Sequence, residues 1–173
     1  MYIVINEDIS NVTVSNVLNK LLARNKEDNS VSVYINSQGG DVDCGYAIYE
    51  MLRLSGCEIT TYAINEVFSS AIIIYLVGAN RYATDYCTFM IHEPFHEYET
   101  DEGVSMDSKY YKKNLKELQE CTSDYFKLIS KHTELTPQKI KNYIAKAEKG
   151  DWYLKPALAK KVGLVTKIGV ILT

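Results

Sequence analysis

The sequence predicts an α/β domain in which most strands run parallel. Short β-branched runs alternate with segments whose apolar residues recur every three or four positions, a pattern typical of strands joined by helices. The chain has 173 residues, of which 46% are hydrophobic and 24% charged. This composition is that of an ordinary globular protein, and the length suffices to bury about two-thirds of the surface of the unfolded chain. We therefore expect one domain over residues 1–173.

The first part of the chain indicates three strands and two helices. The helices begin near Ser10 and Val42, where apolar residues take up helical spacing, and Ser55-Gly56 ends the second one. Asn36-Ser-Gln-Gly-Gly40 is a turn that follows the second strand directly. The strands are expected at residues 2–5, 31–35 and 57–64.

The second part is less regular. The run Ala71 to Val77 is uniformly apolar, so periodicity alone fits a buried helix or a buried strand. Short strands are expected at residues 82–84 and 88–91, followed by an acidic exposed loop at 92–103. A long helical pattern covers residues 106–132, and Thr136-Pro137 opens another helix that Gly150 ends. A strand-like fragment at 152–154, a short helix at 156–162 with Gly163 as its C-cap, and an extended tail at 164–172 complete the chain.

Charge and cysteine usage exclude several classes of function. A formal net charge of -3 without a Lys/Arg cluster gives no basic surface for nucleic acid or for an anionic membrane. No apolar run is long enough to span a membrane, and the N-terminus becomes acidic before a signal peptide could form.

Neither a metal nor a cofactor is expected, and we expect free thiols in a reducing cytoplasm. The four cysteines are scattered and form no CxxC pair: Cys44, Cys57, Cys87 and Cys121.

Candidate chemical groups stand at the ends of predicted strands. His92 closes the strand at 88–91, and active sites in open α/β sheets gather at such carboxyl ends. Ser69 and Ser70 lie between a strand and an apolar run, where a helix N-terminus can face an oxyanion. Taken alone, each also fits a plain structural role: a surface histidine, a helix cap, and at Gly39-Gly40 a tight turn. The GxSxG, Walker and dinucleotide-binding spacings are absent.

Together, the order Gly39-Gly40, Ser69, His92 and Asp151 resembles that of the Clp protease proteolytic subunit, ClpP, over most of the chain. Met90-Ile-His-Glu-Pro94 is similar to the family's Met-Ile-His-Gln-Pro. The other similar stretches are Ile35-Asn-Ser-Gln-Gly-Gly-Asp-Val42, Gly45-Tyr-Ala-Ile-Tyr-Glu-Met51, and Asp151-Trp-Tyr-Leu154 with the later Val162-Gly-Leu164.

The resemblance also separates the two serines. Asn65-Glu-Val-Phe-Ser-Ser-Ala71 corresponds to the family's Gly-x-Ala-Ala-Ser-Met-Gly/Ala, which puts Ser69 on the nucleophile, and the spacing from Ser69 to Gly78 agrees with this register. Three small positions of the family are replaced here by Asn65, Val67 and Phe68, so we expect a bulkier approach to the serine.

The resemblance implies a function for each matched residue. Ser69 is the expected nucleophile, His92 the general base and Asp151 its orienting carboxylate. The backbone N–H groups of Gly39 and Ser70 are expected to form the oxyanion hole, and the expected substrate-binding residues are Gly40 and Asp41. The implied fold consists of repeated β-β-α units of the ClpP/crotonase type, with a protruding helical handle over residues of about 103–148.

The implied activity is that of a serine endopeptidase that cleaves peptides or unfolded polypeptides through an acyl-enzyme. A homo-oligomeric ring is expected, a heptamer or a double ring. The chain begins almost at its first strand, without the family's pore-loop segment, so no AAA+ unfoldase is expected as a partner. A short ClpP-like chain without pore loops also resembles the phage prohead-protease branch, which trims capsid proteins. Two alternatives stay open: a non-catalytic ring subunit in which Phe68 blocks the site, and a crotonase-like acyl-CoA enzyme.

Overall fold

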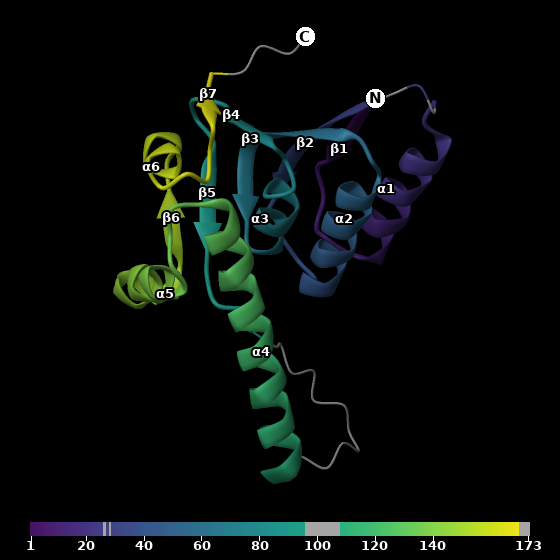
Figure 1. Cartoon of the computed structure of the whole chain (residues 1–173). Coiled ribbons are helices and arrows are strands. Elements are labelled where there is room, and N and C mark those ends of the chain that lie inside the picture. Colours follow the sequence, from purple (N-terminus) through teal and green to yellow (C-terminus); the bar gives the residue numbers. More distant parts are fainter. Residues whose placement is uncertain (26, 28, 96–107, 170–173) are drawn as a thin grey trace.

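A seven-stranded sheet organises the chain in the computed structural model, which describes residues 1–25, 27, 29–95 and 108–169 (Figure 1). The strands follow the order β1-β2-β3-β4-β7, and β5 pairs with β3 while β6 pairs with β5. Every pairing is parallel except that of β5 with β6, so the predicted α/β class with mainly parallel strands is confirmed. The strands are β1 (Tyr2–Ile5), β2 (Ser30–Ser37), β3 (Glu58–Phe68), β4 (Asn80–Ala83), β5 (Thr88–Ile91), β6 (Trp152–Leu154) and β7 (Lys167–Ile168).

Helices α1, α2 and α3 lie side by side against the sheet, and α4 projects away from it (Figure 1). Alternation in the strands explains this packing, because successive side chains of a strand point to opposite faces. In β2, for example, Val31, Val33 and Ile35 are buried while Tyr34 between them is only partly buried. The helices are α1 (Asn11–Ala23), α2 (Val42–Leu54), α3 (Ser70–Tyr75), α4 (Ser108–His132), α5 (Pro137–Lys146) and α6 (Pro156–Lys161).

Strand β3 is longer than the sequence indicates and pairs with two strands in succession. Residues 60–63 pair with β4, and residues 66–68 pair with β5. We expected this strand to end at Ile64, because Asn65 and Glu66 are polar. The backbone continues in the sheet since the N–H of Glu66 donates to Asn36 Oδ1 at 3.1 Å and Glu66 pairs with Thr88. The extension carries the chain directly to Ser69.

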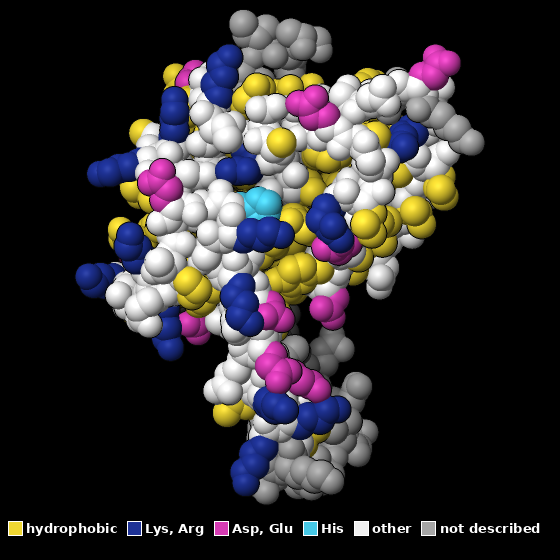
Figure 2. Space-filling model, viewed as in Figure 1, with side chains coloured by type: hydrophobic (Ala, Val, Ile, Leu, Met, Phe, Trp, Pro, Cys, Tyr) yellow, Lys and Arg dark blue, Asp and Glu magenta, His cyan; other side chains and the backbone are white. Residues whose placement is uncertain are grey.

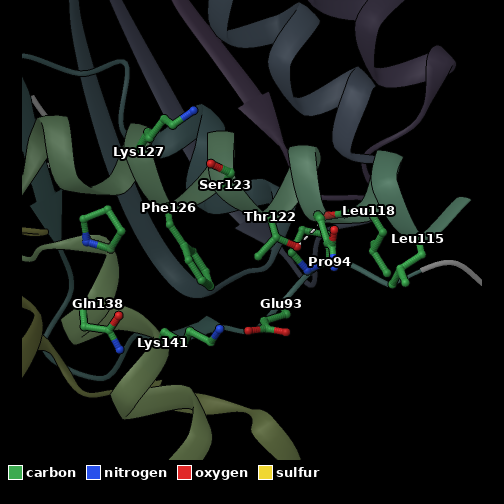
Figure 3. Close-up of a pocket in the computed structure, with 12 residues that line it drawn as sticks. Glu93, Pro94, Leu115, Leu118, Thr122, Ser123, Phe126, Lys127, Gln138 and Lys141 are labelled. Atoms are coloured by element: carbon green, nitrogen blue, oxygen red, sulfur yellow. Dashed lines mark hydrogen bonds between the residues drawn. The ribbon is translucent and has the colours of Figure 1, made fainter. Parts of the chain in front are cut away.

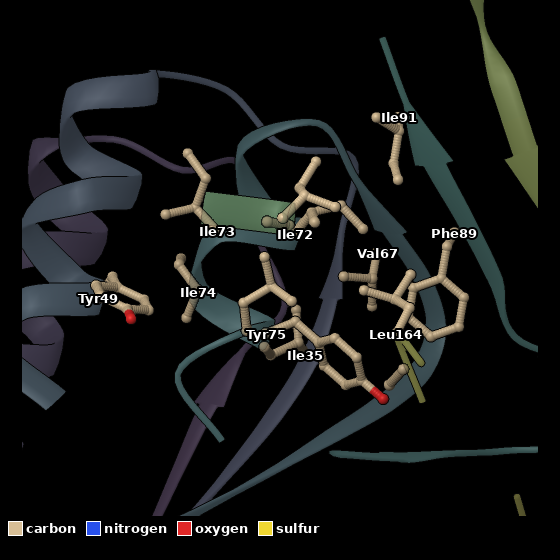
Figure 4. Packing of buried hydrophobic residues seen from close by; sticks show 14 of the residues in the cluster. Ile35, Tyr49, Val67, Ile72, Ile73, Ile74, Tyr75, Phe89, Ile91 and Leu164 are labelled. Atoms are coloured by element: carbon tan, nitrogen blue, oxygen red, sulfur yellow. The ribbon is translucent and has the colours of Figure 1, made fainter. Parts of the chain in front are cut away.

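The ambiguous apolar run forms helix α3, which is buried on all sides. Its residues from Ser70 to Tyr75 are at most 1% exposed, and a helix that is apolar all round belongs inside a core. Figure 4 shows its isoleucines between α2 and the sheet, with the Tyr75 ring beside that of Phe89. The Thr61 hydroxyl donates to the Tyr75 carbonyl oxygen at 2.8 Å and anchors the last turn.

Helix α4 has a buried C-terminal part and an exposed projecting part. Tyr125, Phe126 and Ile129 are buried, whereas the projecting part carries exposed ion pairs four residues apart, such as Lys113 with Glu117. Basic and acidic side chains accordingly alternate along it (Figure 2). The helix start expected at Met106 and most of the loop expected at 92–103 lie outside the described residues.

The segment after α4 differs from expectation at one point. Thr136 caps α5 by accepting from the N–H of Lys139, and Pro137 is its first residue, as predicted. We expected Gly150 to end this helix, but α5 ends at Lys146 because Ala147 is extended. A single 3₁₀ turn (Glu148–Gly150) then leads to β6, and Lys149 within it has a φ of 56°.

Arg81 on β4 ties the end of α4 to the loop after α6. Its buried guanidinium donates to the carbonyl oxygens of Gly78, His132, Gly163 and Leu164 at 2.9–3.0 Å. Charge-assisted bonds to four carbonyls fix the place where α4 meets the sheet.

Over the described ranges, no helix combines the length and apolar content needed to cross a membrane.

Candidate active site

Ser69 occupies the junction between β3 and α3 in a strained backbone conformation. Its φ is 51° and its ψ is -124°, a region that costs a residue other than glycine about 1–3 kcal/mol. The surrounding structure holds this conformation. Its N–H donates to the Met90 carbonyl at 2.9 Å, and its carbonyl oxygen accepts from the N–H of Ile72 at 3.0 Å and from the Tyr125 hydroxyl at 3.1 Å.

His92 follows β5, the strand that pairs with the end of β3, so parallel pairing brings the ends of both strands to the same edge. His92 Nε2 and Ser69 Oγ lie 2.6 Å apart, a hydrogen-bond distance. Burial lowers the pKa of His92 below its ordinary value, and the charge of Asp151 opposes this shift. The imidazole is therefore mainly neutral at pH 7, as a proton acceptor must be.

Asp151 stands immediately before β6. Since Trp152 pairs with Ile91 in the antiparallel register, the preceding Asp151 falls beside His92. Its Oδ1 lies 4.0 Å from His92 Nδ1, close enough for electrostatic attraction but too far for a hydrogen bond. The Asp151 side chain is 34% exposed and that of His92 16%. The three residues singled out from the sequence are thus brought together, with only the Ser69–His92 pair hydrogen-bonded.

The Gly39-Gly40 turn lies against Ser69, and both glycines have positive φ values, of 100° and 139°. A Cβ on Gly39 would lie 2.8 Å from Ser69 Cβ, so only glycine fits here. The Gly39 N–H donates to Ser37 Oγ at 3.1 Å, and Ser37 Oγ itself donates to the Glu7 carbonyl at 2.7 Å. The N–H group of Gly39, which we expected in the oxyanion hole, already has an acceptor within the protein.

Gly40 and Ser70 each present a backbone N–H group without a hydrogen-bond acceptor among the described residues. Gly40 lines the hollow that contains Ser69 and His92. Ser70 is the first residue of α3, where helix N–H groups lack partners within the helix. Its side chain is buried, and Ser70 Oγ lacks a hydrogen-bond partner in the described part of the chain.

The hollow at Ser69 measures about 670 Å³ and opens to solvent. Asp41, which we expected to bind substrate, lines it, but its carboxylate is used to cap α2 by accepting from the Cys44 N–H at 2.8 Å. The hollow is lined by Gln38, Gly40, Asp41, Val42, Ser69, Met90, His92, Pro94, Phe95 and Asp151. No group of three or more metal-ligating side chains occurs among the residues that the structure describes.

A second hollow of about 500 Å³ adjoins the first and shares Pro94 with it. It lies between α4 and α5, with Leu118 and Phe126 as apolar lining (Figure 3). Lys141 reaches across its opening toward Glu93 in the same view. An apolar recess with charged side chains of both signs in its lining therefore lies next to the hollow at Ser69.

Phe68 does not occupy the hollow at Ser69. Its ring packs edge-on against that of Tyr153 on β6, with 5.8 Å between the ring centroids, and the hollow is lined by other residues. The sequence left open that Phe68 blocks the site, but in the structure its ring lies outside the lining of the hollow.

Two residues at the site were not singled out from the sequence. Tyr125 belongs to the apolar pattern of α4, and nothing in that pattern distinguishes a core tyrosine from one whose hydroxyl reaches Ser69. Ser37 stands in the quoted Asn36-Ser-Gln-Gly-Gly40 turn, where a short hydroxyl side chain commonly bonds to backbone two residues away. This preference of serine in turns could have indicated the hydrogen bond between Ser37 and Gly39 from the sequence.

Comparison with known proteins shows the family of the chain. A family model described as Clp protease matches residues 1–171. The chain is 33% identical over 140 residues to ATP-dependent Clp protease proteolytic subunit 2 of Borreliella burgdorferi, an alignment covering 80% of this chain and 66% of that protein. It is 27% identical over 151 residues to the subunit of the same name from Mycolicibacterium paratuberculosis, covering 86% and 70%.

The fold resembles a solved structure as well. A mutant of ClpP1 from Listeria monocytogenes superimposes with a TM-score of 0.84 at 24% sequence identity, covering 98% of this chain and 91% of that chain. The likeness confirms the ClpP-type fold expected from the sequence.

Proposed function

The chain belongs to the Clp protease family, and we propose that it is a serine endopeptidase that cleaves peptides or unfolded polypeptides through an acyl-enzyme. The observation that carries this proposal is the contact of 2.6 Å between Ser69 Oγ and His92 Nε2. A serine hydroxyl becomes an effective nucleophile when a neutral imidazole accepts its proton.

In the proposed mechanism, Ser69 Oγ attacks the carbonyl carbon of the scissile bond while His92 Nε2 takes its proton. The resulting imidazolium returns the proton to the leaving amine, and the C–N bond breaks to give an ester on Ser69. A water molecule, deprotonated by His92, then hydrolyses this ester and regenerates the serine. The carboxylate of Asp151 stabilises the imidazolium by its charge, and substrate binding is expected to shorten the contact of 4.0 Å to a hydrogen bond.

The proposed oxyanion donors are the backbone N–H groups of Gly40 and Ser70. Gly40 replaces Gly39 in this assignment because the Gly39 N–H is bonded to Ser37 Oγ. Both proposed donors are backbone groups without an acceptor among the described residues, so no existing hydrogen bond there has to break when they bind a developing negative charge. Each such donor typically contributes a factor of about 100 to 1,000 in turnover.

We further propose that the protein acts as a homo-oligomeric ring. The handle proposed over residues of about 103–148 includes α4, and the projecting part of this helix supports the proposal because it extends away from the sheet (Figure 1). The prohead-protease type, with capsid proteins as substrates, is the more specific form of the hypothesis.

A peptide-cleavage assay tests the proposed function. The intact assembly is incubated with an unstructured fluorogenic peptide, and the wild type is compared with Ser69→Ala and Ser70→Ala. We expect Ser69→Ala to abolish cleavage and Ser70→Ala to retain it, because Ser70 contributes only its backbone. A correctly assembled wild type without activity toward unstructured peptides or casein contradicts the proposal.

A further inference from the structure

The strained backbone of Ser69 requires restraint from outside its own segment. Its N–H is held by β5 through Met90, and one lone pair of its carbonyl oxygen is held within α3 by the Ile72 N–H. The second lone pair accepts a hydrogen bond from the hydroxyl of Tyr125 on α4, at 3.1 Å. Tyr125 therefore restrains the Ser69 backbone through a side-chain hydroxyl on α4, a helix that is distant from Ser69 in the sequence.

Tyr125 is well suited to hold this position. Its ring is 2% exposed and packs beside that of Phe126, so the side chain has little freedom to turn. Burial raises the pKa of its hydroxyl above the ordinary value, and the group stays protonated and remains a donor. The backbone of α4 is fixed seven residues further on, where Arg81 binds the carbonyl of His132.

Tyr46 on α2 provides an internal comparison. Its hydroxyl is buried and interacts electrostatically with that of Tyr125, but it has no hydrogen-bond partner among the described residues. Removal of the Tyr46 hydroxyl thus takes one oxygen atom from the same region without breaking a bond to the site.

From these contacts we infer that Tyr125 is a positioning residue for the nucleophile: its hydroxyl holds the Ser69 carbonyl and thereby keeps Ser69 Oγ in reach of His92. The inference rests on the proposed function for its catalytic consequence, but not for its structural one. Without the hydroxyl, the carbonyl of Ser69 loses one of its two donors, and only the Ile72 N–H then restrains the carbonyl side of the strained peptide unit between Ser69 and Ser70.

The test compares Tyr125→Phe with the matched control Tyr46→Phe in the full-length assembled protein. We expect Tyr125→Phe to slow both kcat and the labelling of Ser69 by a fluorophosphonate about three- to tenfold, as for the loss of one hydrogen bond. KM and the pH midpoint of labelling, which His92 sets, stay unchanged. Amide hydrogen exchange at Ser69 and Ile72 becomes faster by a similar factor, while Tyr46→Phe matches the wild type throughout.

Three results would overturn the inference. Equal losses in Tyr46→Phe and Tyr125→Phe would assign the effect to packing around α3. A lower Tm in Tyr125→Phe, with labelling and exchange unchanged, would make Tyr125 a core residue only. If the wild type itself is not labelled, the proposed function fails, and hydrogen exchange alone decides the inference: faster exchange confined to Tyr125→Phe supports it, and equal exchange overturns it.

Discussion

His92 Nε2 lies 2.6 Å from Ser69 Oγ, whereas His92 Nδ1 lies 4.0 Å from the nearer oxygen of Asp151. The two sides of one imidazole ring are therefore held differently: one by a short hydrogen bond, the other by charge across a gap. His92 is thus hydrogen-bonded to Ser69, although the Asp151 carboxylate is not hydrogen-bonded to His92. This asymmetry determines how each member of the trio should respond to substitution and to pH.

The first prediction concerns pH. Because burial lowers the pKa of His92, the neutral imidazole persists below the ordinary value of about 6.5. Activity should therefore rise with pH to a plateau, with its midpoint in kcat/KM below about 6.5. Asp151→Asn removes the charge that raises this pKa, so its midpoint should lie lower than that of the wild type.

The profiles of kcat/KM against pH for both proteins provide the measurement. A midpoint that moves upward in Asp151→Asn would contradict the electrostatic role of Asp151. His92→Ala serves as the reference for loss of the base itself, with an expected fall of about 100- to 10,000-fold on the plateau of the wild-type profile.

The second prediction concerns the glycine turn. Gly39→Ala should lower the rate of Ser69 acylation by about 100-fold, because the new Cβ would press on Ser69 Cβ at 2.8 Å and displace the nucleophile. Gly56→Ala is the matched control: its φ is also positive, at 73°, but no atom lies within 4 Å of the added Cβ. It should lose about 1 kcal/mol of stability from backbone strain and keep its activity.

Acylation rates and urea unfolding of the two glycine variants separate these effects. Equal activity losses in both would show that backbone strain, rather than contact with Ser69, governs the result at Gly39.

The third prediction concerns stability. Arg81→Met should lower the free energy of unfolding by about 2–4 kcal/mol, because four carbonyl groups lose their buried donor. The corresponding fall in Tm is about 5–15 °C. Arg53→Met removes an exposed arginine that pairs with Glu50, and its Tm should stay that of the wild type. Thermal unfolding of both variants decides the point, and equal Tm values would refute the proposed anchoring by Arg81.

Much of the fold could be predicted from the sequence because local patterns determine it. The alternation in 31–35 and the cap at Thr136-Pro137 depend on neighbouring residues alone, and both appear in the structure. Strand β3 was predicted too short because its last residues are stabilised by Asn36 and β5, which are distant in sequence. The run Ala71–Val77 could not be assigned by periodicity, since burial on every side removes the polar face that reveals a helix.

The candidate site could be predicted as a set of residues but not in its geometry. Resemblance to the family selected Ser69, His92 and Asp151, and the sheet brings them together. The choice between Gly39 and Gly40 depends on a hydrogen bond to Ser37 Oγ, which spacing does not disclose. The contact of Tyr125 with Ser69 joins residues that are distant in sequence, and it follows from packing rather than from sequence pattern.

The assignment of the nucleophile is tested most directly by mapping the site of fluorophosphonate modification in the assembled protein by mass spectrometry. The proposed mechanism predicts a single adduct on Ser69, lost in Ser69→Ala, strongly slowed in His92→Ala and retained in Ser70→Ala. An adduct on Ser70, or the absence of any adduct in a correctly assembled wild type that the probe can reach, would contradict it.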